Sequence, residues 1–357
     1  MQKLSSIITA TGRYIPEDIV PNQAFINHAF YEKNGERLTR ETSEIISKFK
    51  DITEIEERRY AQPNQVASDL GYLAALDALE SSGTDPETLD YIIVAHNFGD
   101  IPFGNTRLDA IPTIAAKIKN KLKIRNPDCI AYDIPFGCPG WLQAVIQADY
   151  IIRSGDAKKI LVIGTETLSR VTDPHDRDSM IYSDGAGAAL LEASAETGKG
   201  ILAHKAQSHT SCEAYFLYSG KSSNPEYEGD DLFIKMDGRK IYEYALTNVP
   251  LVVKAALDKA GLGLKDVKKV LIHQANGKMD EAILKRLFKL YRAEEIPQGI
   301  MPMIISRYGN SSVATVPTLL DLILKNDLEG HQIDEGDVVL LASVGAGMNI
   351  NAIVYRF

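Results

Sequence analysis

Three polar residues that lie far apart in the chain, Cys138, His273 and Asn310, form a set that can carry out acyl transfer. A thiolate attacks a carbonyl carbon, an imidazole exchanges a proton, and a carboxamide donates a hydrogen bond without titrating. The same set serves carbon–carbon bond-forming thioester chemistry and the hydrolysis carried out by papain-like enzymes. The spacing of the three residues does not separate these two chemistries.

Cys138 lies in the stretch 131–150, where a β-type run breaks at residues 136–137 and a helical pattern begins just after the cysteine. Pro139 suits the first turn of a helix, because its ring fixes φ and its missing N–H would be unpaired there in any case. A thiol at this position feels the partial positive charge of the helix N-terminus, which favours the thiolate. We therefore predict a strand-to-helix turn and a lowered pKa for Cys138. The alternative is a buried small hydrophobic residue in a tight turn.

His273 and Asn310 each end or follow a predicted element. His273 comes directly after the apolar run 270–272, so it is expected at the carboxyl end of a strand, where α/β sheets bind their ligands. Asn310 lies in a loop that leads into a predicted helix at 313–324. Both residues also have ordinary structural interpretations. A strand-end histidine is often a core residue, and an asparagine after a glycine is often a turn or cap residue.

The composition restricts the class of protein. The chain has 357 residues, of which 45% are hydrophobic and 24% charged, which is typical of a globular protein of two domains or two halves. A net charge of -9 argues against nucleic-acid binding. Cys129, Cys138 and Cys212 lack the spacing of a disulfide framework or a zinc cluster, so we expect a cytoplasmic protein without a metal. No apolar run approaches the roughly 18 residues of a membrane span, and the N-terminus does not resemble a signal peptide.

Predicted strands and helices alternate along the chain, which indicates an α/β fold. Strands are expected at 4–11, 91–95, 129–134 and 159–164, and helices at 66–79, 111–122 and 139–153. Residues 22–50 carry two polar helical patterns, and residues 52–60 are predicted to be extended. The loop 97–109 is rich in glycine and asparagine, and a connection of this length is more often functional than idle.

The second half of the chain repeats the pattern of the first. The pattern of apolar and turn residues at 81–96 recurs at 259–274, and the segment 160–193 has a counterpart in 338–357. A repeat of this length indicates two duplicated α/β halves, since a solenoid would repeat every 20 to 50 residues or so. We place the boundary near Gly198, which gives an N-terminal half 1–198 with Cys138 and a C-terminal half 199–357 with His273 and Asn310. The polar, irregular segment 208–231 is predicted to be a surface excursion.

Five motifs of the chain resemble those of the β-ketoacyl-acyl-carrier-protein synthase III family, which has the thiolase fold. They are FGCPGW, DPHDRDSMIYSDGAGAALL, HQANGKM, RYGNSSVATVP and GDVVLLASVGAGMN, and they occur in the family's order and spacing over nearly the whole chain. The resemblance implies a homodimer with an αβαβα layered core. It also implies acyl-coenzyme A or acyl-carrier-protein thioesters as substrates, an acyl carrier protein as partner, and no metal or other cofactor.

The resemblance further implies a role for each residue of the set. Cys138 would hold the acyl group, with an oxyanion hole formed by the backbone N–H of Cys138 and one from the turn containing Ala346 and Gly347. His273 and Asn310 would donate to the carbonyl of a malonyl-type thioester, which becomes an enolate as CO2 leaves in a decarboxylative Claisen condensation. The alternatives are acyl transfer without decarboxylation, thioester hydrolysis, and an acyl- or carrier-binding protein without turnover.

Four basic residues match family positions that bind the carrier protein or coenzyme A. Lys278, Lys285 and Arg286 match the carrier-docking helix, and Arg177 matches an arginine that contacts the nucleotide end of coenzyme A. The ordinary interpretations are a solvated helix face and a loop residue in a salt bridge.

The chain departs from the family at the adenine site. Lys48 and Ile52 stand where members usually carry a tryptophan and an arginine that clasp the adenine of coenzyme A. We therefore predict a specialised member, similar to ketosynthases of dialkylresorcinol or aryl-lipid pathways, that takes its acyl chain from a carrier protein or an unusual thioester. The aromatic and aliphatic residues near enough to the motifs to line the acyl pocket are Phe98, Phe103, Ile111 and Trp141.

Overall fold

The computed structural model describes residues 4–357 and contains two central sheets. The strand order of the first sheet is β1-β7-β6-β4-β5, and that of the second is β11-β12-β13-β8. The strands of the first sheet are β1 (Ser5–Tyr14), β4 (Tyr91–His96), β5 (Ile130–Pro135), β6 (Lys159–Thr167) and β7 (Asp184–Ser194). Those of the second are β8 (Gly200–Ser208), β11 (Val267–Ile272), β12 (Val338–Gly345) and β13 (Asn349–Arg356).

The two sheets share one plan of strand pairing. In the first sheet β4 and β6 are parallel, while β7 is antiparallel to both β6 and β1. In the second sheet β11 and β12 are parallel, while β13 is antiparallel to both β12 and β8. The repeated sequence patterns end in β4 and β11, and they cover β6–β7 and β12–β13, so the predicted internal repeat is confirmed. The boundary near Gly198 falls between β7 and β8, and the division into two domains stays a prediction.

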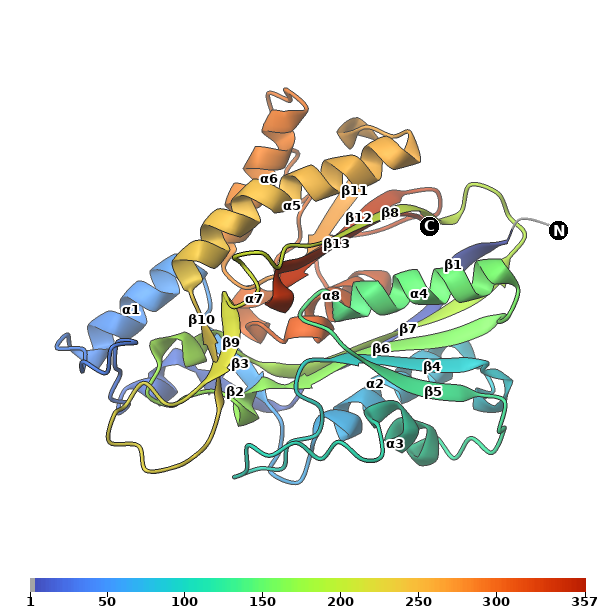
Figure 1. Ribbon diagram of the computed structural model, residues 1–357. Helices are drawn as coiled ribbons and strands as arrows, with labels where there is room; N and C mark the ends of the chain where they lie inside the picture. The colour runs from blue at the N-terminus through green and yellow to red at the C-terminus, as the bar shows by residue number, and fades with distance from the viewer. Residues whose placement is uncertain (1–3) are drawn as a thin grey trace.

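The helices form three layers around these sheets (Figure 1). Helices α4 (Gly140–Ser154) and α8 (Thr315–Leu324) lie between the sheets. Helices α2 (Ala67–Ser82) and α3 (Ile114–Lys121) cover the outer face of the first sheet, and α5 (Gly238–Ala260) and α6 (Gly277–Leu290) cover that of the second. The result is the αβαβα arrangement that the sequence predicts.

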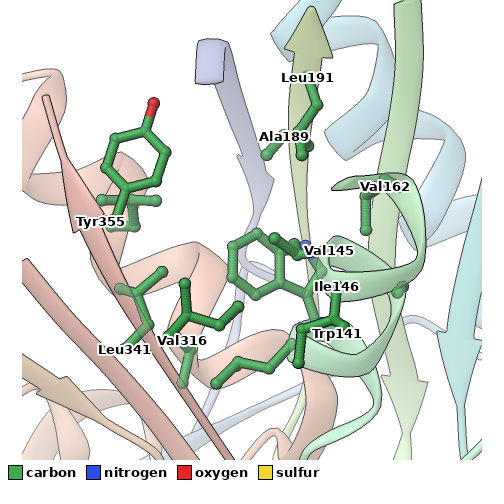
Figure 2. Close-up of a cluster of buried hydrophobic side chains, with 14 of the residues drawn as sticks. Trp141, Val145, Ile146, Val162, Ala189, Leu191, Val316, Leu341 and Tyr355 are labelled. Carbon is green, nitrogen blue, oxygen red and sulfur yellow. The ribbon is translucent and has the colours of Figure 1, made fainter. Parts of the chain in front are cut away.

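The central layer is packed from both sides. Trp141, Val145 and Ile146 of α4 contact apolar side chains of both sheets and of α8 (Figure 2); these include Val162, Ala189, Leu191, Val316, Leu341 and Tyr355. Trp141 is completely buried. Because burial of one large apolar side chain stabilises a fold by about 1.5–3 kcal/mol, this packing fixes the start of α4 firmly. Cys138 lies two residues before that start.

The smaller elements differ from the prediction in two places. Only part of the segment 22–50 is helical, because the chain forms a short 3-10 turn at Asn22–Phe25 and then α1 (Thr42–Thr53). The segment 52–60 is extended only in β3 (Glu57–Tyr60), which pairs with β2 (Asp18–Pro21). The remaining elements include α7 (Ile305–Tyr308) and a hairpin of β9 (Leu217–Gly220) and β10 (Phe233–Met236). Between residues 4 and 357, none of the helices has the length and apolar character that a membrane span requires.

Candidate active site

Cys138 lies in the turn between β5 and α4, as predicted. The turn is closed by a hydrogen bond from the Gly140 N–H to the Gly137 carbonyl at 2.7 Å. The turn between β12 and β13 packs directly on it, because a Cβ atom on Gly137 would lie only 2.6 Å from the Ala346 amide nitrogen. The two turns therefore meet through their backbones at the cysteine.

His273 directly follows β11, and its backbone N–H donates to the Ala342 carbonyl of β12 at 2.9 Å. Asn310 follows α7, and its backbone N–H donates to the Ile181 carbonyl at 3.0 Å. The side-chain Oδ1 of Asn310 accepts a hydrogen bond from the Ser312 N–H at 2.8 Å. This contact fixes the orientation of the carboxamide and leaves the Asn310 Nδ2 group as a donor.

Cys138, His273 and Asn310 line one cavity with a volume of about 260 Å³. Most of the rest of its wall is apolar and comes from β10, α5, α6, β12 and the segments near β6 and β7; its residues include Phe98, Leu168, Ile181, Ile234, Met236, Ile241, Met279, Val344 and Met348. The hairpin of β9 and β10 forms one side through Leu217, Tyr218 and Ser219. The segment 208–231 is therefore more than the surface excursion that the sequence predicts, since part of it forms the pocket wall.

The resting state of the nucleophile differs from the prediction. Burial raises the pKa of the Cys138 thiol to about 11, although a hydrogen bond from Ser312 acts in the opposite direction. Fewer than about one thiol in a thousand is then ionised at neutral pH. Burial also lowers the pKa of His273 to about 4, so the imidazole is neutral. The predicted lowering of the Cys138 pKa was wrong because exclusion of water outweighs the effect of the helix N-terminus.

The oxyanion-hole groups expected from the sequence lie in the two turns that meet at the cysteine. Gly345 and Ala346 line the cavity beside Cys138. Gly347 belongs to the same turn and has a left-handed backbone, with φ 71°. The assignment of the Cys138, Ala346 and Gly347 amides to an oxyanion hole stays a prediction.

The basic residues singled out from the sequence lie outside the cavity. Lys278, Lys285 and Arg286 are on the exposed face of α6, and Lys278 lies between Asn276 and Met279, which both line the cavity. The Lys285 ammonium lies 2.6 Å from the Glu281 carboxylate in an ion pair. The Arg286 guanidinium donates to the Leu246 carbonyl at 3.2 Å.

Arg177 also lies away from the cavity wall. Its guanidinium lies 3.4 Å from the Glu32 carboxylate in an exposed ion pair. The pair agrees with the alternative of a salt-bridging loop residue. Contact with coenzyme A stays a prediction for Arg177, as carrier docking does for the three residues of α6.

Of the four apolar residues expected near the pocket, only Phe98 lines it. Trp141 points into the core between the sheets, because it lies on the buried face of α4. The side chains of Phe103 and Ile111 are 62% and 86% exposed, and Phe103 lies against Arg170 instead of the cavity. The expectation was wrong for Trp141, whereas Phe103 and Ile111 do not line the cavity of their own chain.

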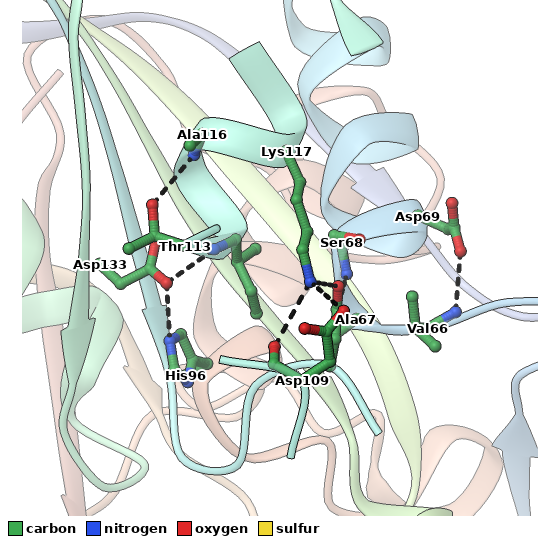
Figure 3. Close-up of polar contacts among 12 residues, drawn as sticks. Val66, Ala67, Ser68, Asp69, His96, Asp109, Thr113, Ala116, Lys117 and Asp133 are labelled. Atoms are coloured by element: carbon green, nitrogen blue, oxygen red, sulfur yellow. Dashed lines mark hydrogen bonds and ion pairs between the residues drawn. The ribbon is translucent and has the colours of Figure 1, made fainter. Parts of the chain in front are cut away.

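The loop that follows β4 is held in place at both ends (Figure 3). His96 lies 3.2 Å from Asp133, whose carboxylate accepts from the backbone N–H groups at the start of α3. Lys117 of α3 pairs with Asp109 at 2.8 Å and with Asp100 at 2.9 Å. These contacts fix the loop 97–109 next to the cavity that Asn97 and Phe98 line.

Three polar residues near Cys138 were missed by the sequence analysis: Asn97, Glu166 and Ser312. Asn97 directly follows β4, and Glu166 lies near the carboxyl end of β6. Ser312 is two residues after Asn310 and donates to the Cys138 sulfur at 3.4 Å. The carboxyl ends of the predicted strands pointed to Asn97 and Glu166, because ligands bind at that edge of an α/β sheet.

Comparison with known proteins identifies the family. Two sequence models of one family match the chain: 3-oxoacyl-[acyl-carrier-protein (ACP)] synthase III over residues 132–210, and its C-terminal part over residues 257–357. A β-ketoacyl-[acyl-carrier-protein] synthase III of Cereibacter sphaeroides is 31% identical over 359 residues, which cover 99% of each chain. The chain belongs to the 3-oxoacyl-[acyl-carrier-protein] synthase III family. Cys138 lies in the first matched part of this family, and His273 and Asn310 lie in the second.

Further relatives agree with this assignment. The synthase III of Staphylococcus saprophyticus is 33% identical over 354 residues, which cover 98% of each chain. The crystal structure of the synthase III from Aquifex aeolicus is 28% identical, covers 99% of this chain and 100% of its own, and superposes with a TM-score of 0.80. The family resemblance seen in the sequence and the thiolase-like fold are thereby confirmed. The family is one of condensing acyltransferases.

Proposed function

We propose that the protein condenses an acyl group bound to Cys138 with a malonyl- or β-ketoacyl-type carrier thioester in a Claisen reaction, which is decarboxylative for the malonyl type. The observation that carries this proposal is the single cavity lined by Cys138, His273 and Asn310. A thiol nucleophile, a neutral imidazole and an oriented carboxamide meet there inside an apolar wall. This combination suits charge development on a thioester carbonyl in a dry site.

In the first step, the Cys138 sulfur attacks the carbonyl carbon of the acyl thioester. The thiol has to lose its proton as the carbon–sulfur bond forms, since its pKa of about 11 keeps it protonated at rest. The thiol proton passes to the departing thiolate sulfur as the old carbon–sulfur bond breaks, and His273 stays neutral throughout. The products are the acyl-enzyme and a free thiol.

In the second step, a malonyl-type extender thioester loses CO2 and becomes an enolate. The N–H of neutral His273 and the Nδ2 group of Asn310 donate to the enolate oxygen, which lowers the barrier by several kcal/mol. The enolate carbon then attacks the acyl carbonyl, and the carbon–sulfur bond to Cys138 breaks. The β-keto thioester leaves, and the Cys138 thiolate takes up one proton.

The acyl primer of the proposed reaction is an apolar chain longer than acetyl. The apolar wall described above suits such a chain, because ligand pockets bind mainly through apolar contact. Lys48 and Ile52 of α1 are both exposed and offer no aromatic clasp for an adenine ring. We therefore propose a specialised member that takes its primer from a carrier protein or an unusual thioester.

The proposed partners follow from the same chemistry. An acidic acyl carrier protein would dock on the basic face of α6, where Lys278 lies beside the cavity residues Asn276 and Met279. The protein would act as a homodimer, and neither a metal ion nor another cofactor takes part in the proposed steps. Within residues 4–357, no cluster of three or more histidine, cysteine, aspartate or glutamate side chains is arranged to hold a metal ion. The cytoplasmic location stays a prediction.

Intact-protein mass spectrometry tests the proposed function. The protein and a Cys138→Ala variant are incubated with a panel of acyl-coenzyme A and acyl-carrier thioesters, and malonyl-carrier thioester is then added. We expect an acyl adduct only on the protein with Cys138, followed by loss of the adduct together with CO2 release and a β-keto product. Release of free acid without CO2 would support a hydrolase, and the absence of any adduct would support a non-catalytic binding protein.

A further inference from the structure

Ser312 contacts two residues of the proposed catalytic set. Its hydroxyl donates to the Cys138 sulfur at 3.4 Å, and its backbone N–H donates to the Asn310 Oδ1 atom at 2.8 Å. The residue is buried, and its φ of 54° is in the left-handed region. A residue other than glycine rarely adopts this conformation, and strain of this kind is concentrated at functional sites.

The hydroxyl hydrogen of Ser312 is directed by Asn97. The Nδ2 atom of Asn97 lies 2.8 Å from a carboxylate oxygen of Glu166 and 2.7 Å from the Ser312 Oγ atom. The same carboxylate oxygen accepts from the Asn97 backbone N–H at 2.8 Å and so acts as an acceptor here, which means that the NH2 group of Asn97 must face Glu166 and therefore also Ser312. The Ser312 oxygen accepts from Asn97, which leaves its own hydrogen free to point at the sulfur.

Glu166 holds Asn97 in place. It is completely buried near the end of β6 and accepts further hydrogen bonds from the backbone N–H groups of Asn97 at 2.8 Å and Phe98 at 3.3 Å. The loop that carries Asn97 is also held by the contact of His96 with Asp133 and by the ion pair of Lys117 with Asp109 (Figure 3). Asn97 consequently has little freedom to turn its amide away from Ser312.

We propose that Ser312 is a further catalytic residue, which stabilises negative charge on the Cys138 sulfur, and that Asn97 is the positioning residue that aims its hydroxyl. The inference rests on the proposed function for the steps in which this charge appears. The sulfur becomes negative as the thiol proton leaves, and again when the bond to the acyl group breaks. Ser312 keeps its own proton in both steps and contributes a charge-assisted hydrogen bond.

The surroundings of the thiol explain why such a donor is needed. Burial and the Glu166 carboxylate both raise the pKa of Cys138, whereas the Ser312 hydroxyl and the Cys138 backbone N–H act against them. The titratable side chains that line the cavity or act on the thiol are Glu166, Tyr182, Tyr218, Tyr242 and His273. Among these surroundings, Ser312 supplies the side-chain hydrogen bond that lowers the pKa of Cys138.

The test measures the alkylation of Cys138 by iodoacetamide over a series of pH values. All variants carry Cys212→Ser, because Cys212 is exposed and would react as well. The test variants are Ser312→Ala and Ser312→Gly, both of which remove the hydroxyl. Glycine accepts the left-handed backbone without strain, so it separates loss of the hydroxyl from any change in the backbone. The matched control is Ser311→Ala, since the Ser311 hydroxyl contacts Thr315 at 3.3 Å instead of the cysteine.

We expect both Ser312 variants to alkylate about 10- to 100-fold more slowly at a given pH, because a hydrogen bond to a charged group is lost. Ser311→Ala should match the parent. Asn97→Asp should resemble the Ser312 variants, since a carboxylate oxygen at that position would accept the Ser312 hydrogen and turn it away from the sulfur. Thermal melting of each variant shows that the compared proteins are folded.

Unchanged alkylation in Ser312→Gly, or equal slowing in Ser311→Ala, would overturn the inference. The outcome is independent of the proposed condensation, because alkylation requires no acyl substrate. If the parent protein forms no β-keto product and the Ser312 variants still alkylate slowly, the proposed function fails and the role of Ser312 stands. If the parent condenses and the Ser312 variants alkylate and condense at its rates, the proposed function stands and the role of Ser312 fails.

Discussion

Gly345 and Cys138 are packed backbone to backbone, so that a Cβ atom on Gly345 would lie 2.5 Å from the cysteine amide nitrogen. Such a contact is far below the separation of non-bonded heavy atoms, which is about 3.5–4.0 Å at its optimum. The turn after β12 in the second sheet therefore determines the position of the nucleophile, which follows β5 in the first. This contact joins the two sheets at the site where the chemistry is proposed.

Gly345→Ala should displace this turn and impair acylation. We expect the variant to lose about 1–3 kcal/mol of stability through overpacking and to acylate at least tenfold more slowly, because the cysteine and its amide shift together. Urea unfolding and the rate of adduct formation by mass spectrometry measure the two effects. Gly263→Ala is the matched control, since its new methyl group would meet no atom closer than 3.7 Å. Equal acylation rates in the two variants would contradict the prediction.

The buried imidazole of His273 makes stability depend on pH. Its pKa is about 4 in the folded protein, compared with 6.5 when it is exposed, so the unfolded chain binds more protons between these values. Stability therefore falls as the pH decreases from 6.5 towards 4. Between pH 7 and pH 5, the protein should lose about 2 kcal/mol more than a His273→Gln variant, which does not titrate there. Urea unfolding at the two pH values measures the difference, and parallel losses in both proteins would argue against a neutral buried His273.

Lys235 and Asp173 form a buried ion pair that supports the pocket wall. The Lys235 ammonium on β10 lies 2.5 Å from Asp173 and 3.1 Å from Asp176. Lys235→Met leaves the Asp173 carboxylate buried and unpaired, so we expect a loss of about 3–5 kcal/mol in urea unfolding. The control is Lys254→Met, because the exposed pair of Lys254 and Asp258 at 2.6 Å should contribute less than about 1 kcal/mol. Similar losses in the two variants would show that β10 is not held by this pair.

A change at the proposed carrier site should affect carrier-linked thioesters and small thioesters differently. Lys278→Glu should raise KM about tenfold for a carrier-linked thioester, because it places a negative charge opposite an acidic partner. The KM for a small pantetheine-type thioester should stay unchanged, since Lys278 lies outside the cavity. Lys265→Glu is the control, as it makes the same charge change on an exposed residue before β11. Equal effects of the two variants on the carrier substrate would point to net charge instead of a docking site.

The sequence predicted those parts of the site that local patterns determine. The strand-to-helix turn at Cys138 and the strand end at His273 follow from apolar periodicity and turn residues, and the two halves follow from the repeat. The predicted lowering of the Cys138 pKa was wrong because this pKa depends on how completely other segments exclude water. No local sequence pattern records that exclusion. Trp141 was misplaced for a related reason, since proximity to a motif does not tell which face of α4 a side chain occupies.

The contacts of Ser312 could not be predicted from the sequence, for the same physical reason. Asn97, Glu166 and Ser312 come from three separate segments, and only the folded chain brings their polar atoms within 3 Å or so of one another. The wall formed by β9 was missed because its residues lie in a polar segment. Leu217, Tyr218 and Ser219 of this segment nevertheless line the cavity once the chain is folded.

Leu217 on β9 tests how this wall limits the acyl chain. The side chain lines the cavity together with Ile241 and Met348, so Leu217→Trp should fill part of the volume of about 260 Å³. Longer acyl groups should then form the Cys138 adduct at least tenfold more slowly, because they would have to overpack the pocket. Short acyl groups should react as before, since Cys138 itself is unchanged.

Leu217→Ala is the matched variant, and it should extend the accepted chain lengths. The measurement is adduct formation from a series of straight-chain thioesters, and the same chain-length profile in all three proteins would show that the acyl chain lies elsewhere.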